Sequence, residues 1–411
     1  MRLICVYQHA PTAGAPGFYR HRRYFAELVN RGWGVDLVSC PVDYLTGRTP
    51  ARYARRPYLR ETLDGVVHHW TWGVSNVHAS RLRRTLNYIT FSATSTVRGL
   101  TLPTPDLVWA SSPPLPIGVV GMLLARRFRR PWILEIRDLW PESAASVGWL
   151  DRSSTTYRVL ERLAHGFTSR ADAVLVPTPG LVEGARAHGA RTVDVITGTI
   201  VERAVSDERR RAVRAELGAA DGTCLFVYLG AIGVANGIDA VLDAAKDLSD
   251  EPGVGFVLGG DGSDRARLDR RVADERIANV RFLGPVPPAR VAEVLAAGDV
   301  CLHTLRNDPV FHAALPNKVL DYLGAHRPFV TTVEGLPRRV AEESGGGFAL
   351  PGPSLTAELR RWVRMAPEER AARGEQGFAY GSERFRLSNV VDELEALLRR
   401  TARVRVVSPA S

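Results

Sequence analysis

The chain has 411 residues, of which 45% are hydrophobic and 24% are charged, a composition typical of a globular protein with about two to three domains. We expect a cytoplasmic protein without membrane spans, zinc or disulfides, because no uncharged apolar run reaches about 18 residues, no signal-peptide cleavage site follows the start, and the four cysteines stand apart. The net charge of +10 is spread over short arginine clusters, which favours phosphorylated ligands or an anionic membrane surface over nucleic acid.

Short β-branched runs alternate with longer helical patterns in the first half, which predicts a parallel sheet with crossover helices. We expect strands at residues 3–8, 35–39, 66–70, 107–110, 132–136, 173–176 and 193–196. Helices are expected at residues 19–31, 81–100, 117–128, 155–170 and 179–188.

The same pattern restarts after residue 197, and the polar stretch at 200–211 is interpreted as a linker. Strands are expected at residues 225–229, 254–258, 280–283, 300–303, 329–332 and 347–350. Helices are expected at residues 237–248, 264–274, 288–297, 316–325, 336–342, 355–365 and 388–400, and residues 403–411 are expected to fray.

The fold class predicted by this pattern is α/β, with two doubly wound Rossmann-like domains at residues 1–198 and 199–375. The last segment, residues 376–411, is expected to carry a helix that crosses back to the first domain. Sheets of this kind bind ligands beyond the C-terminal ends of their strands, so we expect the two domains to face each other across a ligand-binding cleft.

The turn after the first strand contains His9 and Gly17 and leads into a helix that begins with Arg20 and other basic residues. Basic side chains oppose the dipole at a helix start, and a bound anion would relieve that conflict. We therefore assign Arg20 and His9 to acceptor binding, and Gly17, where backbone can approach a ligand closely, to nucleotide-sugar binding. The alternative is that these arginines are solvated.

The block Arg137-Asp138-Leu139-Trp140-Pro141-Glu142-Ser143 follows the fifth strand, at the edge where a parallel sheet binds its ligands. We assign Asp138 and Arg137 to catalysis and Glu142 to the acceptor, with Asp138 orienting a nucleophile or accepting hydroxyl groups. The alternative is that Asp138 pairs with Arg137 and Glu142 caps the next helix.

Loops rich in small residues follow three strands of the second half, where backbone can approach a phosphate or a nucleobase closely. Each is, taken alone, more often a structural turn. The residues that we assign to nucleotide binding here are Gly230, Ile232, Gly233, Asn236, Gly260, Asp261, Val286 and Arg306.

The helix predicted after Pro316 is the strongest anion-site candidate. Proline suits a first helical position, and the free N–H groups and dipole of the first turn favour an anion. Lys318 adds a full charge in that turn and is one of only two lysines in this arginine-rich chain. With Asn317 and with Asp321 one turn later, it is expected to hold a diphosphate and a ribose. The alternative is that Lys318 and Asp321 pair on a surface helix.

Taken together, these motifs resemble the retaining glycosyltransferases of family 4, which have the GT-B fold, and most closely the branch of WbuB-type amino-sugar transferases. The specific matches are the intact block from Arg137 to Ser143 and the stretch from Pro316 to Gly324, which has substitutions at Asn317, Asp321 and Gly324. The resemblance implies transfer of a sugar from a nucleoside diphosphate, UDP rather than GDP, with retention and without a cofactor or a metal. Asp321 matches the ribose-binding glutamate and Lys318 a diphosphate contact.

Two departures from the family pattern concern charge at the donor site. Ala313 replaces the first of two glutamates, and Ala231 and Asn236 stand in the loop where the family has arginine and lysine. The diphosphate charge is then left to Lys318, helix N-termini, Arg306 or an arginine of the first domain.

Three functions remain open on the sequence: this glycosyltransferase, a sugar-nucleotide epimerase of the same fold, and a nucleotide-binding protein without transfer activity. The acceptor is a small natural-product-like molecule or a polyprenyl-linked one. In the latter case residues 48–60 and the helix from Arg81 are expected to rest on an anionic membrane.

Overall fold

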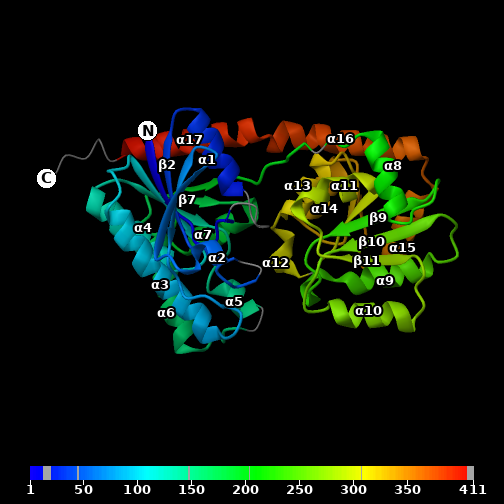
Figure 1. Cartoon of the computed structure of the whole chain (residues 1–411), viewed down its shortest axis with the longest axis horizontal. Coiled ribbons are helices and arrows are strands. Elements are labelled where there is room, and N and C mark those ends of the chain that lie inside the picture. The colour runs from blue at the N-terminus through cyan, green and yellow to red at the C-terminus, as the bar shows by residue number, and fades with distance from the viewer. Residues whose placement is uncertain (13–19, 44–45, 147–148, 203, 307, 405–411) are drawn as a thin grey trace. The chain divides into compact units, whose positions relative to one another are not determined.

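The computed structural model of the chain describes residues 1–12, 20–43, 46–146, 149–202, 204–306 and 308–404. The chain divides into two compact units, unit 1 with Met1–Thr197 and Leu387–Ser411, and unit 2 with Gly198–Arg386 (Figure 1). Each unit is built around its own twisted sheet with helices on both faces, which confirms the predicted class of two Rossmann-like α/β domains.

In its described residues, unit 1 has a sheet with the strand order β3-β4-β2-β1-β5-β6-β7-β8. Its strands are β1 (Arg2–Val6), β2 (Gly34–Ser39), β3 (Tyr58–Leu63), β4 (Val66–Thr71), β5 (Leu107–Ser112), β6 (Trp132–Ile136), β7 (Ala173–Val176) and β8 (Val193–Val195). Its helices are α1 (Arg20–Asn30), α2 (Ala51–Ala54), α3 (Arg81–Leu100), α4 (Ile117–Phe128), α5 (Glu142–Ser146), α6 (Thr155–Thr168), the 3₁₀ turn η1 (Pro179–Leu181), α7 (Val182–Ala187) and α17 (Leu387–Val404).

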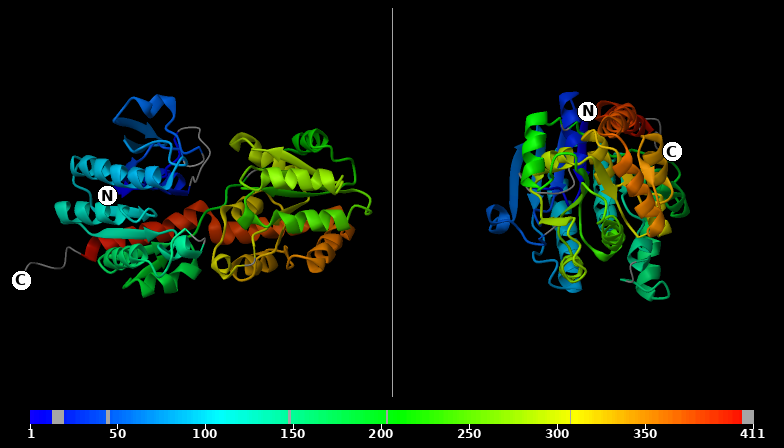
Figure 2. Two further views of the ribbon diagram at one scale, coloured as in Figure 1. Left: turned by 90° about the horizontal axis from the view of Figure 1, so that it is seen from below. Right: turned by 90° about the vertical axis from the view of Figure 1, so that its right-hand side faces the viewer.

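Both faces of this sheet are buried, because alternate residues of the parallel strands point to opposite sides. Leu3 and Cys5 of β1 pack into a core with α1 and α17, whereas Ile4 and Val6 pack into a second core with α3, α4 and α6. Figure 2 gives two further views of the helices around the sheet. The near-continuous apolar runs of the sequence are thus explained by burial on two faces.

Unit 2 has, in its described residues, a parallel sheet with the order β11-β10-β9-β12-β13-β14. Its strands are β9 (Cys224–Leu229), β10 (Val254–Gly259), β11 (Val280–Gly284), β12 (Val300–His303), β13 (Phe329–Thr331) and β14 (Gly347–Phe348). Its helices are α8 (Asp207–Glu216), η2 (Val234–Asn236), α9 (Ile238–Asp247), α10 (Arg265–Asp274), α11 (Pro288–Ala297), α12 (Pro309–His312), α13 (Asn317–Gly324), α14 (Leu336–Glu343), α15 (Pro353–Arg364) and α16 (Pro367–Phe385).

The predicted linker at residues 200–211 is wrong in its second part, because α8 begins at Asp207. The side chain of Ser206 caps this helix by accepting a hydrogen bond from the Arg209 N–H, and two acidic residues in the first turn favour the dipole. Two arginines of this stretch, Arg209 and Arg210, pair with acidic residues elsewhere in unit 2. One example is Arg210, which lies 2.9 Å from the Asp299 carboxylate.

Helix α16 was not predicted, because its interior contains several glycines, which disfavour isolated helices. Here the glycines allow close packing of α16 within unit 2. A Cβ at Gly374 would overlap the carbonyl oxygen of His326, and Gly381 lies against Leu323 of α13. The predicted division between residues 375 and 376 falls inside this helix, and α17, which packs on α1 in unit 1, begins at Leu387.

Strand β3 was also missed, and its first three residues end the 48–60 stretch that we expected to contact a membrane or an acceptor. It pairs antiparallel with β4 at the edge of the sheet, and its side chains alternate in burial. Glu61 accepts hydrogen bonds from the Tyr53 hydroxyl at 2.8 Å and from the Trp70 indole at 2.6 Å. This stretch therefore has a structural role in covering the sheet edge.

Candidate functional site

Three loops at the C-terminal ends of β9, β10 and β11 lie side by side in unit 2. The Gly230 N–H donates to the Gly259 carbonyl at 3.0 Å, and the Gly260 N–H donates to the Gly284 carbonyl at 2.7 Å. Gly260 has a φ of +139°, and a Cβ there would overlap the Gly230 carbonyl oxygen. Only glycine fits this position, so the small residues bring backbone together at the edge where parallel sheets bind ligands.

The first of these loops is closed by Asn236. Its side-chain oxygen accepts the Gly233 N–H at 3.1 Å, and its backbone N–H donates to the Gly233 carbonyl at 2.9 Å. The loop is also tied to the segment after β12, because the Arg306 N–H donates to the Ala235 carbonyl at 2.9 Å. Asn236 thus shapes the loop, and the Arg306 side chain is exposed beside it.

Lys318 lies in the first turn of α13 and points to the loop that follows β9. Its Nζ donates to the Tyr228 hydroxyl at 3.0 Å and lies 4.3 Å from the centre of the Tyr228 ring. A Cβ at Gly230 would be 3.0 Å from this Nζ. The structure therefore brings together Lys318 and Gly230, which are far apart in the sequence, at one edge of the sheet.

The surroundings of Lys318 make the charged form of its side chain less stable. Burial lowers the pKa of the Lys318 ammonium from 10.5 to about 8. Among the described residues, Nζ contacts a neutral hydroxyl and an aromatic ring, and neither of these contacts is acidic. A partly buried ammonium with such neutral contacts is suited to binding an anion.

Tyr228 is a residue that the sequence analysis missed. Its hydroxyl donates to the Ala231 carbonyl at 2.7 Å while accepting from Lys318, so one side chain connects the loop to the lysine. Burial raises the pKa of this hydroxyl, which therefore stays protonated. A tyrosine at the end of an apolar strand gave no sequence signal of this role.

His303 at the end of β12 lies near Lys318 and is fully buried. Its Nδ1 is 2.8 Å from the Thr331 hydroxyl, and its Nε2 has no hydrogen-bond partner among the described residues. Burial and then the charge of Lys318 lower the pKa of His303 well below its ordinary value, so the ring is neutral. A neutral ring beside Lys318 adds no competing charge to the site.

The remaining donor-site candidates lie on the same elements. Asn317 is exposed and begins α13, and Asp321 is partly buried one turn later on the same helix. Asp261 joins two of the loops, since its carbonyl accepts the Ile232 N–H at 2.9 Å. Val286, after β11, packs against Gly259.

Arg265 is a basic residue at this edge that the sequence analysis did not single out among the many arginines. Its guanidinium lies 4.3 Å from the centre of the Phe282 ring and donates to the Gly260 carbonyl at 3.5 Å. It also pairs with Asp269 at 2.8 Å. Arg265 therefore places positive charge beside the second loop.

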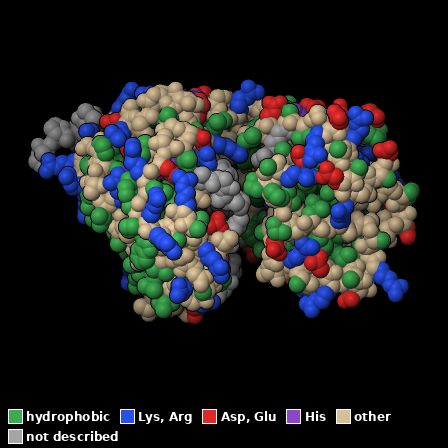
Figure 3. Space-filling view, viewed as in Figure 1, with side chains coloured by type: hydrophobic (Ala, Val, Ile, Leu, Met, Phe, Trp, Pro, Cys, Tyr) green, Lys and Arg blue, Asp and Glu red, His purple; other side chains and the backbone are tan. Residues whose placement is uncertain are grey.

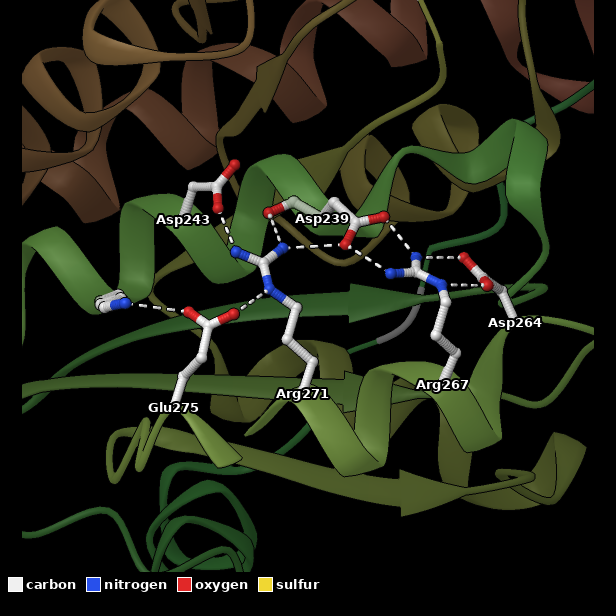
Figure 4. Close-up of polar contacts among 7 residues, drawn as sticks. Asp239, Asp243, Asp264, Arg267, Arg271 and Glu275 are labelled. Carbon is white, nitrogen blue, oxygen red and sulfur yellow. Dashed lines mark hydrogen bonds and ion pairs between the residues drawn. The ribbon is translucent and has the colours of Figure 1, made fainter. Parts of the chain in front are cut away.

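An arginine–carboxylate network holds α10 on α9, next to these loops (Figure 4). Arg267 binds Asp264 at 2.7 Å and Asp239 at 3.0 Å, and Arg271 binds Asp239 at 2.8 Å and Glu275 at 2.8 Å. The second lysine of the chain, Lys246, pairs with Glu275 at 3.0 Å. These charges satisfy one another, so their role is structural.

A second group of polar residues lies at the C-terminal edge of the unit 1 sheet, centred on Glu135 of β6. Its carboxylate is fully buried, pairs with Arg20, and lies 2.6 Å from Nε2 of His21. Burial alone would raise the pKa of Glu135, but the neighbouring His21 and the Arg20 guanidinium outweigh it and hold that pKa well below its usual range. The Glu135 carboxylate thus pairs with the basic residues at the start of α1, where we expected a bound anion.

Glu135 was not predicted as a site residue, although a glutamate in the strand Trp132–Ile136 is unusual for a two-faced buried strand. Arg137 follows it and stacks over the Tyr7 ring at 4.9 Å, while its guanidinium donates to the Pro113 carbonyl. The Tyr7 hydroxyl, His21 Nδ1 and Arg137 Nε are buried without a hydrogen-bond partner among the described residues. This edge therefore offers polar atoms to a ligand.

His9 lies beside Arg137, and burial and then that charge lower the pKa of His9 to about 3, so the ring is neutral. Asp138 is exposed and lines a small hollow with Trp140 and His188. Glu142 begins α5 and its carboxylate lies 2.7 Å from Nε2 of His188. Glu142 is thus engaged within the protein, and Gly17 lies outside the described residues.

Two family models match the chain in succession. Residues 19–197 match the glycosyl transferase 4-like domain, and residues 223–363 match the glycosyl transferases of group 1. The two matches fall in unit 1 and unit 2 and together cover most of the chain.

Two curated proteins are related to the chain in sequence. A probable glycosyltransferase, WbjE of Pseudomonas aeruginosa, is 26% identical over 263 residues, which are 63% of this chain and 65% of that protein. The match therefore spans slightly less than two thirds of the relative. The putative colanic acid biosynthesis glycosyl transferase WcaI of Escherichia coli is 29% identical over 32% of this chain and 31% of its own length.

Solved structures with a similar fold cover nearly the whole chain. HepE from Anabaena, crystallised with UDP-glucose, has a TM-score of 0.70 at 18% identity and covers 97% of this chain and 100% of its own. Sucrose-phosphate synthase from Thermosynechococcus elongatus has a TM-score of 0.72 at 16% identity and covers 97% and 98%. At these identities the likeness establishes the fold alone, and it confirms the GT-B architecture.

Proposed function

Because the chain belongs to the group 1, or family 4, glycosyltransferases, we propose that it transfers a sugar from a nucleoside diphosphate donor to an acceptor. Unit 2 supplies the donor site in this proposal, with the diphosphate at the first turn of α13 and at the loop after β9. The ribose lies at Asp321, where the resemblance to the family places a carboxylate. The loops after β10 and β11 surround the rest of the nucleotide.

The observation that carries the proposal is the position of Lys318. Its ammonium lies against the glycine loop, is partly buried, and is held by the neutral hydroxyl of Tyr228. A helix start, a glycine loop and a lysine together are suited to a diphosphate. Arg265 beside Gly260 supplies further positive charge, in place of the loop arginine that the family pattern has and this chain lacks.

The chemistry follows from the charge that develops during the reaction. Breaking the bond between the anomeric carbon and the phosphate oxygen builds negative charge on the leaving diphosphate. Lys318 and the backbone N–H groups of α13 are fixed donors for that charge, so they stabilise the transition state more than the ground state. We propose a retaining, metal-independent transfer in which the leaving phosphate itself takes the proton of the acceptor.

The acceptor is assigned to the C-terminal edge of the unit 1 sheet. There Arg137 and the neutral His9 lie together, and the buried Tyr7 hydroxyl and His21 Nδ1 have no hydrogen-bond partner among the described residues. Arg20 acts on the acceptor only indirectly, because it is paired with Glu135. A small natural-product-like acceptor and a polyprenyl-linked one both fit this proposal, as does the WbuB-type branch with an amino-sugar donor.

UDP is the expected nucleotide. HepE, whose fold matches over the whole chain, was crystallised with UDP and with UDP-glucose, which supports this choice.

The test is to incubate the full chain with a panel of UDP-sugars and GDP-sugars and to measure released nucleoside diphosphate, with and without candidate acceptors. We expect slow UDP release from one UDP-sugar, accelerated by the right acceptor. Conversion of the donor sugar to its epimer without release would identify an epimerase. Binding of a nucleotide sugar with neither outcome, across all acceptors, would argue for a binding protein.

A further inference from the structure

Helix α3 carries an exposed apolar stripe along its whole length. Leu82, Leu86, Ile89, Val97 and Leu100 are all exposed, with Leu82 at 68% and Val97 at 67%. Steps of three and four residues, with Ala93 filling the gap, place these side chains on one side of the helix. The opposite side is buried in unit 1, where Phe91 packs into the core shared with the sheet and Gly99 lies against Leu124 of α4. The helix therefore presents a second apolar face that its own unit does not bury.

Two neighbouring helices extend this stripe into a surface. Helix α4 packs against α3 and exposes Val119 and Leu123, and α6 packs against α4 and exposes Val159 and Leu163. Trp149, 54% exposed, lies under the guanidinium of Arg84 at 5.0 Å. We call this the α3–α4–α6 surface. Figure 3 shows hydrophobic side chains gathered with basic ones over these helices.

The charges on this surface are almost all positive. From Arg81 to Leu100 and from Ile117 to Phe128 the chain has no aspartate or glutamate. The arginines that the three helices contribute are Arg81, Arg83, Arg84, Arg126, Arg127, Arg158 and Arg162, against the single acidic residue Glu161. Arg98 is left out, because its guanidinium lies 4.3 Å from the centre of the Tyr58 ring at the edge of the sheet. Exposed apolar side chains bordered by arginine define an interfacial, membrane-binding surface in physical terms.

We propose that the α3–α4–α6 surface docks on an anionic lipid bilayer, with the apolar stripe at the boundary between headgroups and acyl chains and the arginines on the lipid phosphates. In the described part of the chain, no helix is long and apolar enough to cross a bilayer. A second copy of the chain is a poor occupant, because symmetric pairing would set one arginine-rich face against another. Nucleic acid is also a poor occupant, because it would leave the apolar stripe exposed to water.

The surface belongs to unit 1 and the proposed donor site to unit 2, so vesicle binding is measured without any nucleotide sugar, and its outcome is independent of the donor assays. The full chain is sedimented with phosphatidylcholine vesicles that contain or lack phosphatidylglycerol, at low and high salt. We expect binding to the anionic vesicles only, weakened by salt because the arginine contribution is screened.

Variants of the surface test its apolar stripe and its arginines separately. Ile89→Glu places a charge in the stripe, and the pair Arg126→Glu and Arg127→Glu reverses two exposed charges. We expect the arginine pair to weaken binding by at least about tenfold, since each basic residue near an anionic surface contributes severalfold. The matched controls are Leu350→Glu, an exposed leucine in unit 2, and Arg55→Glu with Arg56→Glu, which lie outside the three helices. These controls are expected to bind as the wild type does.

Three results would overturn the proposal. One is no binding to anionic vesicles at low salt, and another is a loss of binding with the Arg55 and Arg56 changes that equals the loss with Arg126 and Arg127. The third is a dimer in sedimentation velocity that Ile89→Glu dissociates, which would make the surface an interface between two copies.

Discussion

Replacing Lys318 by alanine is expected to lower turnover by about 10²–10³-fold, the effect of removing one preorganised donor from a developing negative charge. Lys318 is the basic side chain that lies directly against the loop after β9, within 3.0 Å of the Tyr228 hydroxyl. Its loss leaves the diphosphate with backbone donors and Arg265. The effect is expected in kcat as well as in kcat/KM, because the charge grows as the bond breaks.

The matched control is Lys246→Ala, because Lys246 is the other lysine of the chain and pairs with Glu275 on the surface of unit 2. Its turnover is expected to equal that of the wild type. A Lys318→Ala enzyme with normal turnover, or a Lys246→Ala enzyme that is equally impaired, would remove Lys318 from the reaction.

The pH profile gives the same prediction a second readout. The protonated ammonium is the active form, and burial lowers the pKa of Lys318 from 10.5 to about 8. In the free enzyme the charge is therefore lost as the pH rises through about 8, and kcat/KM is expected to fall above that pH. A bound diphosphate raises the pKa, so the fall in kcat should occur at higher pH. Lys318→Arg should abolish this alkaline limb, since arginine keeps its charge.

Replacing Glu135 by alanine is expected to have the largest effect on stability, about 3–5 kcal/mol lost from the free energy of unfolding. The carboxylate is fully buried, and its removal leaves the partly buried Arg20 and the imidazole of His21 without their partner. Urea unfolding followed by tryptophan fluorescence measures the loss. Unit 1 is expected to unfold first, so two transitions should separate in the variant.

The contribution of Glu135 to the stability of the fold depends on pH in a direction that can be predicted. The folded state holds its pKa below the unfolded value, so the contribution to stability is present above about pH 4.3 and is lost as the pH falls further. A control is Glu183→Ala, whose carboxylate is 85% exposed in a surface pair with Arg186 and should leave unfolding unchanged. Equal stability of the Glu135 variant and the wild type would show that the buried cluster is not structural.

The sheet and most helices were predictable because each unit repeats a strong local pattern. The apolar run 132–136 became β6 (Trp132–Ile136) without change, since a strand buried on both faces leaves little ambiguity. Helix α16 and strand β3 were missed, because the glycines of α16 and the alternating polar residues of β3 gain their stability from tertiary contacts. Local propensity carries no information about such contacts.

The candidate site was predictable only in part, and for a related reason. Lys318 was identifiable because a lysine is rare in this chain and follows a proline at a helix start. Tyr228 and Glu135 were not identified, because their roles depend on partners 90 and 114 positions away, Lys318 and His21. Arg265 was not identified, because it is one of many arginines and is distinguished by its contacts with Gly260 and Phe282, which the sequence does not reveal.

The most direct test of the central claim is the position of the diphosphate in crystals of the full chain grown with UDP. The account predicts phosphate oxygens within hydrogen-bonding distance of Lys318 Nζ and of backbone N–H groups in the first turn of α13, and the ribose at Asp321. A diphosphate bound elsewhere, with Lys318 still bonded only to Tyr228, would contradict it.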